Sequence, residues 1–289
     1  MDKKYCFGHN VSIANGGLCK NLKSAHSHQC KPNAFQVFVQ NAQSFRTSPI
    51  KDYIAKECKE YIKESGIYLV VHSPFILNMS KCNPPDPGTF NCAYENIKAA
   101  HQIGASGTIF HVGKSLKMDL DEALDNMENF IRKIIKKMKE DNIKSYFILE
   151  TGAGQGTEVC CDIKDLAKFF KRFSKDEKKH FRFCVDTCHV FASGYNLKKK
   201  DDVKEFLKLW KHEIGWRYVD VIHLNDSKKD CACKVDRHEN LKEGFIWKDK
   251  ESNGLKYFIK KMKEKCIPVV LETPDLEGES LTRQLNLIK

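Results

Sequence analysis

The segment Ser145–Glu150 (SYFILE) is a short apolar run that ends in a carboxylate. A continuous apolar run of this length, without alternating polar residues, is typical of a parallel strand buried on both faces. Seven further runs of the same kind occur along the chain: Tyr5–His9, Ala34–Val39, Ile67–His72, Thr108–Val112, Phe181–Asp186, Val219–Leu224 and Ile267–Glu272. The sequence therefore predicts eight buried parallel strands.

Longer segments with helical spacing separate these runs. One begins at Ser48-Pro49, a pattern typical of an N-cap followed by proline in the first turn, and ends at Gly66. In another, apolar residues form one helical stripe against a Lys-rich outer face. This stripe consists of Leu120, Ala123, Leu124, Met127, Ile131, Ile134 and Met138.

Strands that alternate with helices in this way predict an α/β fold, a (β/α)₈ TIM barrel that forms a single domain over residues 1–289. The length alone would also suit two average domains, but no stretch has the composition of an interdomain linker. A doubly wound open sheet is the alternative. It would need a Gly-rich phosphate loop after an early strand, and the pair Gly16-Gly17 is weak support for one.

The chain carries 49 Lys and Arg against 38 Asp and Glu, a net charge of +11. This excess indicates either a solvated Lys-rich surface or a polyanionic partner, and charge alone does not distinguish them. Neither a secretory signal nor an apolar run of membrane-span length is evident. We therefore expect a soluble intracellular protein, in the cytoplasm, the nucleus or a viral compartment, without a membrane partner.

The 13 cysteines are expected to be mostly reduced in such a setting. Cys231 and Cys233 form a CxC pair that could bind zinc, although a second Cys/His pair at structural-zinc spacing is missing. The segment His26–Cys30 (HSHQC) is either an extra metal site or a plain loop.

Metal-competent side chains lie at or next to the ends of most of the predicted strands. They are His72, His111, Glu150, Asp186, His223 and Glu272, and the first strand ends in His9. Because the C-terminal ends of barrel strands form one ring, these side chains should converge on one mouth. A single histidine there is more typical of an ordinary rim residue, but the whole set favours bound cations, which relieve repulsion among clustered carboxylates.

Two short motifs extend this set. Asp186-Thr187-Cys188-His189 and Asp236-Arg237-His238 supply His189, Asp236 and His238 as a further three-ligand site. The nine candidate ligands, His9 not counted, suit three ions, with Glu150 as the natural bridge. Mixed imidazole and carboxylate ligands favour Zn²⁺, with Mn²⁺ or Fe²⁺ as alternatives. Metal clusters of this kind serve phosphoryl transfer.

The motifs resemble those of the endonuclease IV family of apurinic/apyrimidinic (AP) endonucleases, in family order from the first strand to the last. The matching segments are Gly8-His9, Val71–Phe75, Phe110–Gly113, Leu149–Gly156, Val185–His189, Ala192–Tyr195, Ile222–Ser227, Asp236–Glu239 and Leu271–Pro274. The combination of Asp-Thr-Cys-His, His-Leu-Asn-Asp-Ser and Asp-Arg-His-Glu is highly specific.

This resemblance implies a zinc-dependent hydrolase of base excision repair, which nicks duplex DNA 5′ to an abasic site and leaves a 3′-hydroxyl and a 5′-deoxyribose phosphate. It leaves open a 3′-end-cleaning or exonuclease side activity, and we expect a monomer. It places one zinc on His72, His111 and Glu150. It places a second on Glu150, Asp186, His223 and Glu272, and a third on His189, Asp236 and His238. Of these, Glu150, Asp186 and Glu272 would be the catalytic carboxylates.

The residues expected to contact DNA are His9, Asn41, Gln43, Phe45, Phe75 and Arg237. Two of them depart from the family pattern. Gln43 stands where many relatives carry a basic residue that enters the DNA stack, and Phe75 stands where tyrosine is common. Phe75 could instead be a core residue that packs against Ile76 and Leu77.

Two rival functions stay open at this point. A sugar isomerase of related barrel architecture would bind two metal ions and would not need a third metal site. A DNA-damage-binding protein with structural metals would be expected to lack part of the ligand set. Metal content tests the first rival, and nicking of an abasic duplex tests the second.

Overall fold

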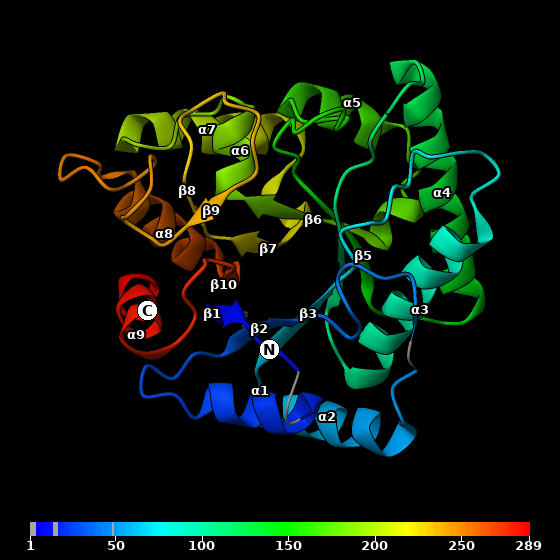
Figure 1. Cartoon of the computed structure of the whole chain (residues 1–289), viewed down its shortest axis with the longest axis horizontal. Coiled ribbons are helices and arrows are strands. Elements are labelled where there is room, and N and C mark those ends of the chain that lie inside the picture. Colours follow the sequence, from blue (N-terminus) through cyan, green and yellow to red (C-terminus); the bar gives the residue numbers. More distant parts are fainter. Residues whose placement is uncertain (1–3, 14–16, 48) are drawn as a thin grey trace.

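The predicted barrel is confirmed by the computed structural model, which describes residues 4–13, 17–47 and 49–289 (Figure 1). Parallel strands close on themselves in the order β1-β10-β7-β6-β5-β4-β3-β2, so the doubly wound alternative is wrong. The strands are β1 (Phe7–Asn10), β2 (Ala34–Val37), β3 (Tyr68–His72), β4 (Gly107–Phe110), β5 (Tyr146–Glu150), β6 (Phe181–Asp186), β7 (Val219–His223) and β10 (Val269–Leu271).

Helices surround the barrel as an outer layer (Figure 1). They are α1 (Leu18–His26), α2 (Asp52–Ser65), α3 (Pro87–Ile103), α4 (Leu120–Glu140), α5 (Ile163–Lys171), α6 (Thr187–Ser193), α7 (Lys200–Glu213), α8 (Gly254–Lys265) and α9 (Gly278–Ile288). Two short 3₁₀ turns, η1 (Glu177–Lys179) and η2 (Trp216–Tyr218), lead into β6 and β7. A small antiparallel pair, β8 (Asp226–Ser227) and β9 (His238–Glu239), lies outside the barrel sheet.

The start of α2 differs from its prediction, whereas its end agrees. Gly66 closes the helix with φ 68°, a left-handed conformation that glycine adopts without strain. The helix begins at Asp52, after Lys51 in an extended conformation, so Pro49 precedes it. The Asp52 carboxylate in the first turn complements the positive end of the helix dipole, which favours this later start. Ser48, the predicted N-cap, lies outside the described residues.

The predicted stripe of α4 packs against the barrel with one exception. Ala123, Met127, Ile131, Ile134 and Met138 are buried, and Leu124 is half-buried. Leu120, at the first position of the helix, is 58% exposed, because the first turn extends beyond the surface that the stripe covers. The rest of the stripe thus holds α4 against the sheet.

One layer of the barrel interior takes a residue from every strand or the position just before it. The layer consists of Cys6, Ala34, Val70, Ile109, Ile148, Cys184, Val221 and Val270, all of them buried. Because side chains alternate between the two faces of a strand, this layer fixes which residues face inward at the C-terminal mouth.

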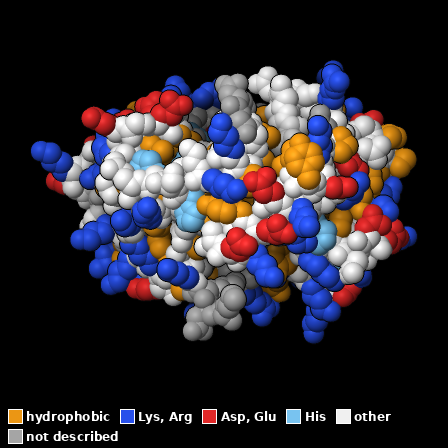
Figure 2. Space-filling view, turned by 90° about the horizontal axis from the view of Figure 1, so that it is seen from below, with side chains coloured by type: hydrophobic (Ala, Val, Ile, Leu, Met, Phe, Trp, Pro, Cys, Tyr) orange, Lys and Arg blue, Asp and Glu red, His pale blue; other side chains and the backbone are white. Residues whose placement is uncertain are grey.

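Figure 2 shows the face seen from below in Figure 1, where Lys and Arg side chains are spread among acidic ones instead of forming one continuous patch. The distribution on this face therefore does not decide between a solvated surface and a polyanionic partner. Within the described parts of the chain, no helix is long and apolar enough to span a membrane.

Candidate metal centre

The mouth of the barrel is lined by residues that each follow a residue of the interior layer by two positions along the chain. Strand periodicity places them on the same inner face, at the C-terminal ends of seven strands. They are Gln36, His72, His111, Glu150, Asp186, His223 and Glu272. Six of the predicted metal-competent residues are in this ring, and Gln36 is an addition that was not among the predicted residues.

His9 is not part of this ring of mouth residues. It pairs in register with Phe35 and Leu271, which pack toward the outer helices, so it lies on the opposite face of β1 from the interior layer. Its Nδ1 donates to the Asn10 carbonyl at 2.8 Å, and its buried Nε2 has no hydrogen-bond partner among the residues that the structure describes. The His9 side chain instead lines a separate cavity of about 580 Å³, together with Asp275.

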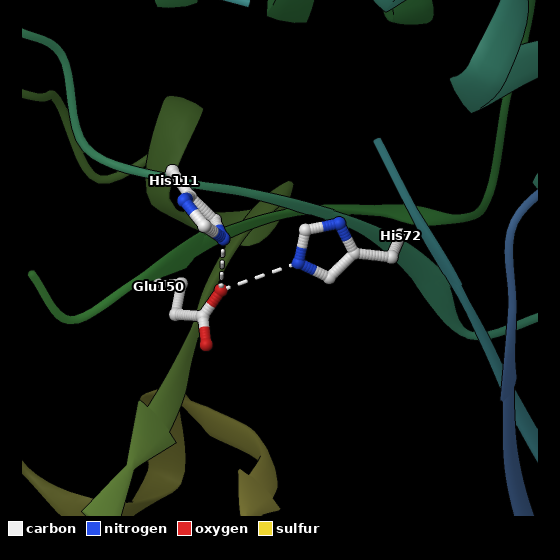
Figure 3. A group of neighbouring side chains, drawn as sticks. All are labelled: His72, His111 and Glu150. Carbon is white, nitrogen blue, oxygen red and sulfur yellow. Dashed lines mark hydrogen bonds and ion pairs between the residues drawn. The ribbon is translucent and has the colours of Figure 1, made fainter. Parts of the chain in front are cut away.

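Glu150 holds the first group of side chains together. Its Oε2 lies 3.4 Å from Nε2 of His72 and 3.2 Å from Nε2 of His111. Figure 3 shows both imidazoles turned toward this one carboxylate oxygen. Glu150 and His72 are almost completely buried, whereas the His111 side chain is 22% exposed. This group therefore opens toward solvent on the His111 side.

The other oxygen of Glu150 belongs to a second group. Its Oε1 lies 2.7 Å from Nδ1 of His223, and that nitrogen lies 2.8 Å from Oε2 of Glu272 and 3.9 Å from Oδ2 of Asp186. The four ligand atoms lie within 4.8 Å of one another. Glu150 is thus placed to bridge two adjacent cation positions, one on each carboxylate oxygen.

Asp236 organises a third group at the rim. Its Oδ2 lies 3.2 Å from Nε2 of His189, and its Oδ1 lies 3.2 Å from Nε2 of His238. The same His238 nitrogen lies 3.4 Å from Oδ2 of Asp186, which connects this group to the second. The Asp236 side chain is 29% exposed, so the third group is the most open to solvent of the three.

The hydrogen bonds of these histidines fit a metal site. Nδ1 of His72 donates to the Ser73 carbonyl at 2.6 Å, and Nδ1 of His189 donates to the Thr151 carbonyl at 2.8 Å. His238 does the same with the carbonyl of Glu272 at 3.2 Å. A carbonyl only accepts, so each neutral ring keeps its Nε2 lone pair facing a carboxylate. A nitrogen lone pair and a carboxylate oxygen repel at this distance unless a cation or a proton lies between them.

The pKa values of these residues also indicate that the carboxylates favour a nearby positive charge. Burial lowers the pKa of His238, but Asp186 and Asp236 outweigh it and raise the value to about 9. Burial likewise opposes the charge on Glu272, yet His223 lowers its pKa to about 2. In His111, by contrast, burial dominates and lowers the pKa to about 4. Without cations, the carboxylates thus favour a proton on His238, whereas burial keeps His111 neutral.

Two buried amides support the ring of mouth residues. Asn225 donates from Nδ2 to Oδ2 of Asp186 at 2.7 Å, and its Oδ1 accepts from the backbone N–H of Glu272 at 2.9 Å. Gln36 contacts both His223 and Glu272. The sequence does carry a signal for Gln36, because a glutamine inside the otherwise apolar strand AFQV indicates a buried polar contact.

The residues expected to contact DNA lie in surface loops apart from His9. Phe45 and Phe75 are 44% and 47% exposed, and Asn41, Gln43 and Arg237 are also exposed. Phe75 is therefore not a core residue. Its ring packs 5.2 Å from that of His72 and 5.4 Å from that of His111, and its backbone N–H donates to the Ala42 carbonyl. The two loops thus meet beside the first group.

The other sequence candidates for metal binding are not brought into such groups. Among the described residues, no group of metal-competent side chains includes Cys231, Cys233 or the histidines of His26–Cys30. The segment His26–Cys30 instead connects the α1–β2 loop to α9, because His28 and the Cys30 thiol both contact Thr282. Its arrangement corresponds to the plain-loop interpretation.

The closed barrel and the cluster of metal-competent side chains at its mouth are together typical of TIM-barrel enzymes, whose active sites lie at this end, and comparison with known proteins agrees. The family model described as "Xylose isomerase-like TIM barrel" matches residues 27–287. A protein of Acanthamoeba polyphaga mimivirus named for endonuclease 4 is 34% identical over 252 residues, which cover 84% of this chain and 78% of the relative. An endonuclease 4 relative from Halothermothrix orenii is 31% identical over 287 residues, 98% of each chain.

The chain belongs to the endonuclease IV family. The crystal structure of endonuclease IV from Thermus thermophilus superposes with a TM-score of 0.81 at 21% identity, and covers 98% of this chain and 97% of that one. At that identity the likeness shows a shared fold, and it agrees with the family assignment.

Proposed function

We propose that this chain is a zinc-dependent AP endonuclease that hydrolyses the phosphodiester 5′ to an abasic site in duplex DNA and leaves a 3′-hydroxyl and a 5′-deoxyribose phosphate. The single observation that carries the proposal is the position of Glu150, whose two oxygens each serve a different group of metal-competent side chains. A bridged cluster of this kind suits phosphodiester hydrolysis.

Each group would hold one ion. The three sets are His72 with His111 and Glu150, then Glu150 with Asp186, His223 and Glu272, and finally His189 with Asp236 and His238. Imidazole nitrogen and carboxylate oxygen together suit Zn²⁺, with Mn²⁺ or Fe²⁺ as substitutes. When bound, such ions lower the pKa of water toward neutrality and stabilise the attacking and leaving oxygens of a phosphodiester.

The protein's own side chains position the substrate and keep the centre preorganised. The buried Glu150 and Asp186 and the partly buried Glu272 would supply the negative charge that holds the cations. The backbone carbonyls of Ser73 and Thr151 orient His72 and His189. The exposed loops would enter the duplex at the lesion through Asn41, Gln43, Phe45 and Phe75, with Arg237 and His9 as further contacts. Extruding a nucleotide requires least energy where the base is already missing, which favours abasic sites.

Incubation of a duplex that holds one abasic analogue, with and without a chelator, tests the proposal. Nicking on the 5′ side that the chelator abolishes is the expected result. Tight binding without nicking would favour a damage-binding protein with structural metals. The family description leaves a sugar isomerase as the second candidate, and conversion of a polyol substrate without nicking would favour it.

The protein purified without added chelator should contain about three zinc ions per chain. The expectation follows from the three groups of His, Asp and Glu ligand atoms described above, each within 4.8 Å. Two overlapping groups that include Cys184 or Cys188 take their other members from these three, so they add no separate position. Elemental analysis of the purified protein measures it. Two ions per chain would favour the isomerase alternative, and one or none would rule out the trinuclear centre.

Replacing Phe75 by alanine should weaken affinity for abasic duplex by about 1–3 kcal/mol, the scale of a base–aromatic stack. Folding stability should change little, because the side chain is 47% exposed, whereas a buried phenylalanine would lose about 3–5 kcal/mol. The matched control is Tyr53→Ala, which removes a 67% exposed aromatic from α2. Binding, thermal stability and zinc content are measured on both variants. Unchanged binding by Phe75→Ala would show that Phe75 does not enter the duplex.

A further inference from the structure

Gln36 is a buried polar residue at the centre of an apolar strand. It is 0% exposed and faces the barrel interior from β2, where it pairs in register with Asn10 and Val70. It offers no charge and belongs to none of the groups of metal-competent side chains. A buried amide in such a position is favourable only when its hydrogen bonds are satisfied, so its partners indicate its role.

The orientation of the Gln36 amide is fixed by those partners. Its Nε2 lies 2.5 Å from Oε1 of Glu272 and 3.5 Å from Oδ1 of Asn10, and both of these oxygens accept. The Oε1 atom of Gln36 then faces Nε2 of His223 at 2.7 Å. The reverse orientation would place the amide oxygen against the Glu272 carboxylate, where two acceptors repel. Gln36 must therefore accept from His223.

This bond decides which nitrogen of His223 is free. An imidazole whose Nε2 carries the hydrogen keeps its lone pair on Nδ1 in the neutral ring. Nδ1 is the atom that faces Glu150 and Glu272, at 2.7 and 2.8 Å. His223 thus presents the opposite nitrogen from its neighbours, because His72, His189 and His238 donate from Nδ1 and present Nε2.

The source of this orientation also differs. In His72, His189 and His238 the acceptor is a backbone carbonyl, which a substitution does not remove. In His223 it is the side chain of Gln36, which at the same time holds Glu272. One amide therefore controls two of the four residues in the second group.

We propose that Gln36 is a positioning residue that holds His223 with its hydrogen on Nε2 and Glu272 in a fixed orientation, and so sets the affinity of the second metal position. This inference rests on the proposed metal-dependent function. It assigns no contact between Gln36 and substrate. The chemical basis is the general one that groups behind a metal ligand fix its tautomer and its direction.

Gln36→Met is the sharpest test. Methionine keeps the length and volume of glutamine, but it lacks the oxygen acceptor and the N–H donors, and it leaves no room for water. In chelator competition, one of the bound zinc ions should be lost about 10–100-fold more readily than from the unmodified protein. The remaining zinc should be retained, because His72, His111, His189 and His238 do not contact Gln36.

Two further variants complete the experiment. Gln36→Ala leaves space in which a water can accept from His223, so its loss of zinc affinity should be smaller, and it serves as the test if the methionine variant does not fold. Asn126→Leu removes a buried amide from α4, where Nδ2 donates to the Ser80 carbonyl, and is the matched control. The thermal stability of each chelated variant separates a positioning role from a general packing role.

The outcomes distinguish this inference from the proposed function. Weakened binding of a single ion by Gln36→Met, with chelated-state stability like that of the control, supports the positioning role. Zinc affinities of both Gln36 variants equal to that of Asn126→Leu, in a protein that binds zinc normally, overturn it. If the unmodified protein binds no zinc at all, the proposed metal centre itself is wrong.

Discussion

Glu150→Gln should reduce nicking of an abasic duplex by about 10³-fold or more, equivalent to about 4 kcal/mol of transition-state stabilisation. Glutamine keeps the shape of the side chain but removes the charge that two neighbouring groups share. Its amide would also turn an N–H donor toward a histidine nitrogen that needs to keep its lone pair. The substitution therefore disturbs two cation positions at once.

The comparison with His189→Ala makes this prediction specific to the bridge. His189 belongs only to the third group, where its Nε2 contacts Asp236, so its loss should affect one cation position and reduce nicking less. Its Nδ1 also lies 3.7 Å from Oε1 of Glu150, but that nitrogen donates to the Thr151 carbonyl and is not available to a cation. Glu95→Gln, which removes a charge paired with Lys98 on α3, controls for the loss of a carboxylate elsewhere. Rates are compared at matched zinc occupancy. Equal losses in Glu150→Gln and His189→Ala would contradict the shared role of Glu150.

The barrel could be predicted because its strands are buried on both faces and therefore appear as continuous apolar runs. Ser145–Glu150 gives β5 from Tyr146 to Glu150, and Phe181–Asp186 gives β6 with the same bounds. The helix start at Asp52 differs from the Ser48-Pro49 signal because Lys51 is still extended and the Asp52 carboxylate in the first turn favours the later start.

The barrel topology predicted that the mouth residues converge. The sequence alone did not determine, for each residue, whether its side chain points into the barrel or toward the outer helices. His9 ends its predicted run like His72, but β1 extends to Asn10. His9 lies one position away from the inward alternation and packs against Phe35. Gln36 has the correct alternation and was overlooked because amides are weak metal ligands. Partners such as Asn225 become apparent only when strands distant in sequence are adjacent in space.

Chelated protein should become less stable as the pH rises from about 6.5 to about 8.5, whereas zinc-loaded protein should not. In the folded chelated state, burial lowers the pKa of His238, but Asp186 and Asp236 raise it from 6.5 to about 9. A histidine whose pKa is raised on folding contributes stability that is complete below its unfolded pKa and is lost as the pH approaches the folded value. For His238 alone the loss is about 1.4 kcal/mol per pH unit in this range.

Zinc reverses the trend because it takes the place of the proton. A histidine ligand must be neutral, so zinc binding releases the proton of His238 and becomes more favourable as the pH rises. Denaturant unfolding at several pH values, with chelator and with zinc, measures both slopes. His238→Asn should flatten the slope of the chelated protein, and His212→Asn, an exposed histidine of α7, should leave it unchanged. A chelated protein whose stability rises over this range, or an effect of His212→Asn equal to that of His238→Asn, would show that the carboxylates of the mouth do not hold these protons.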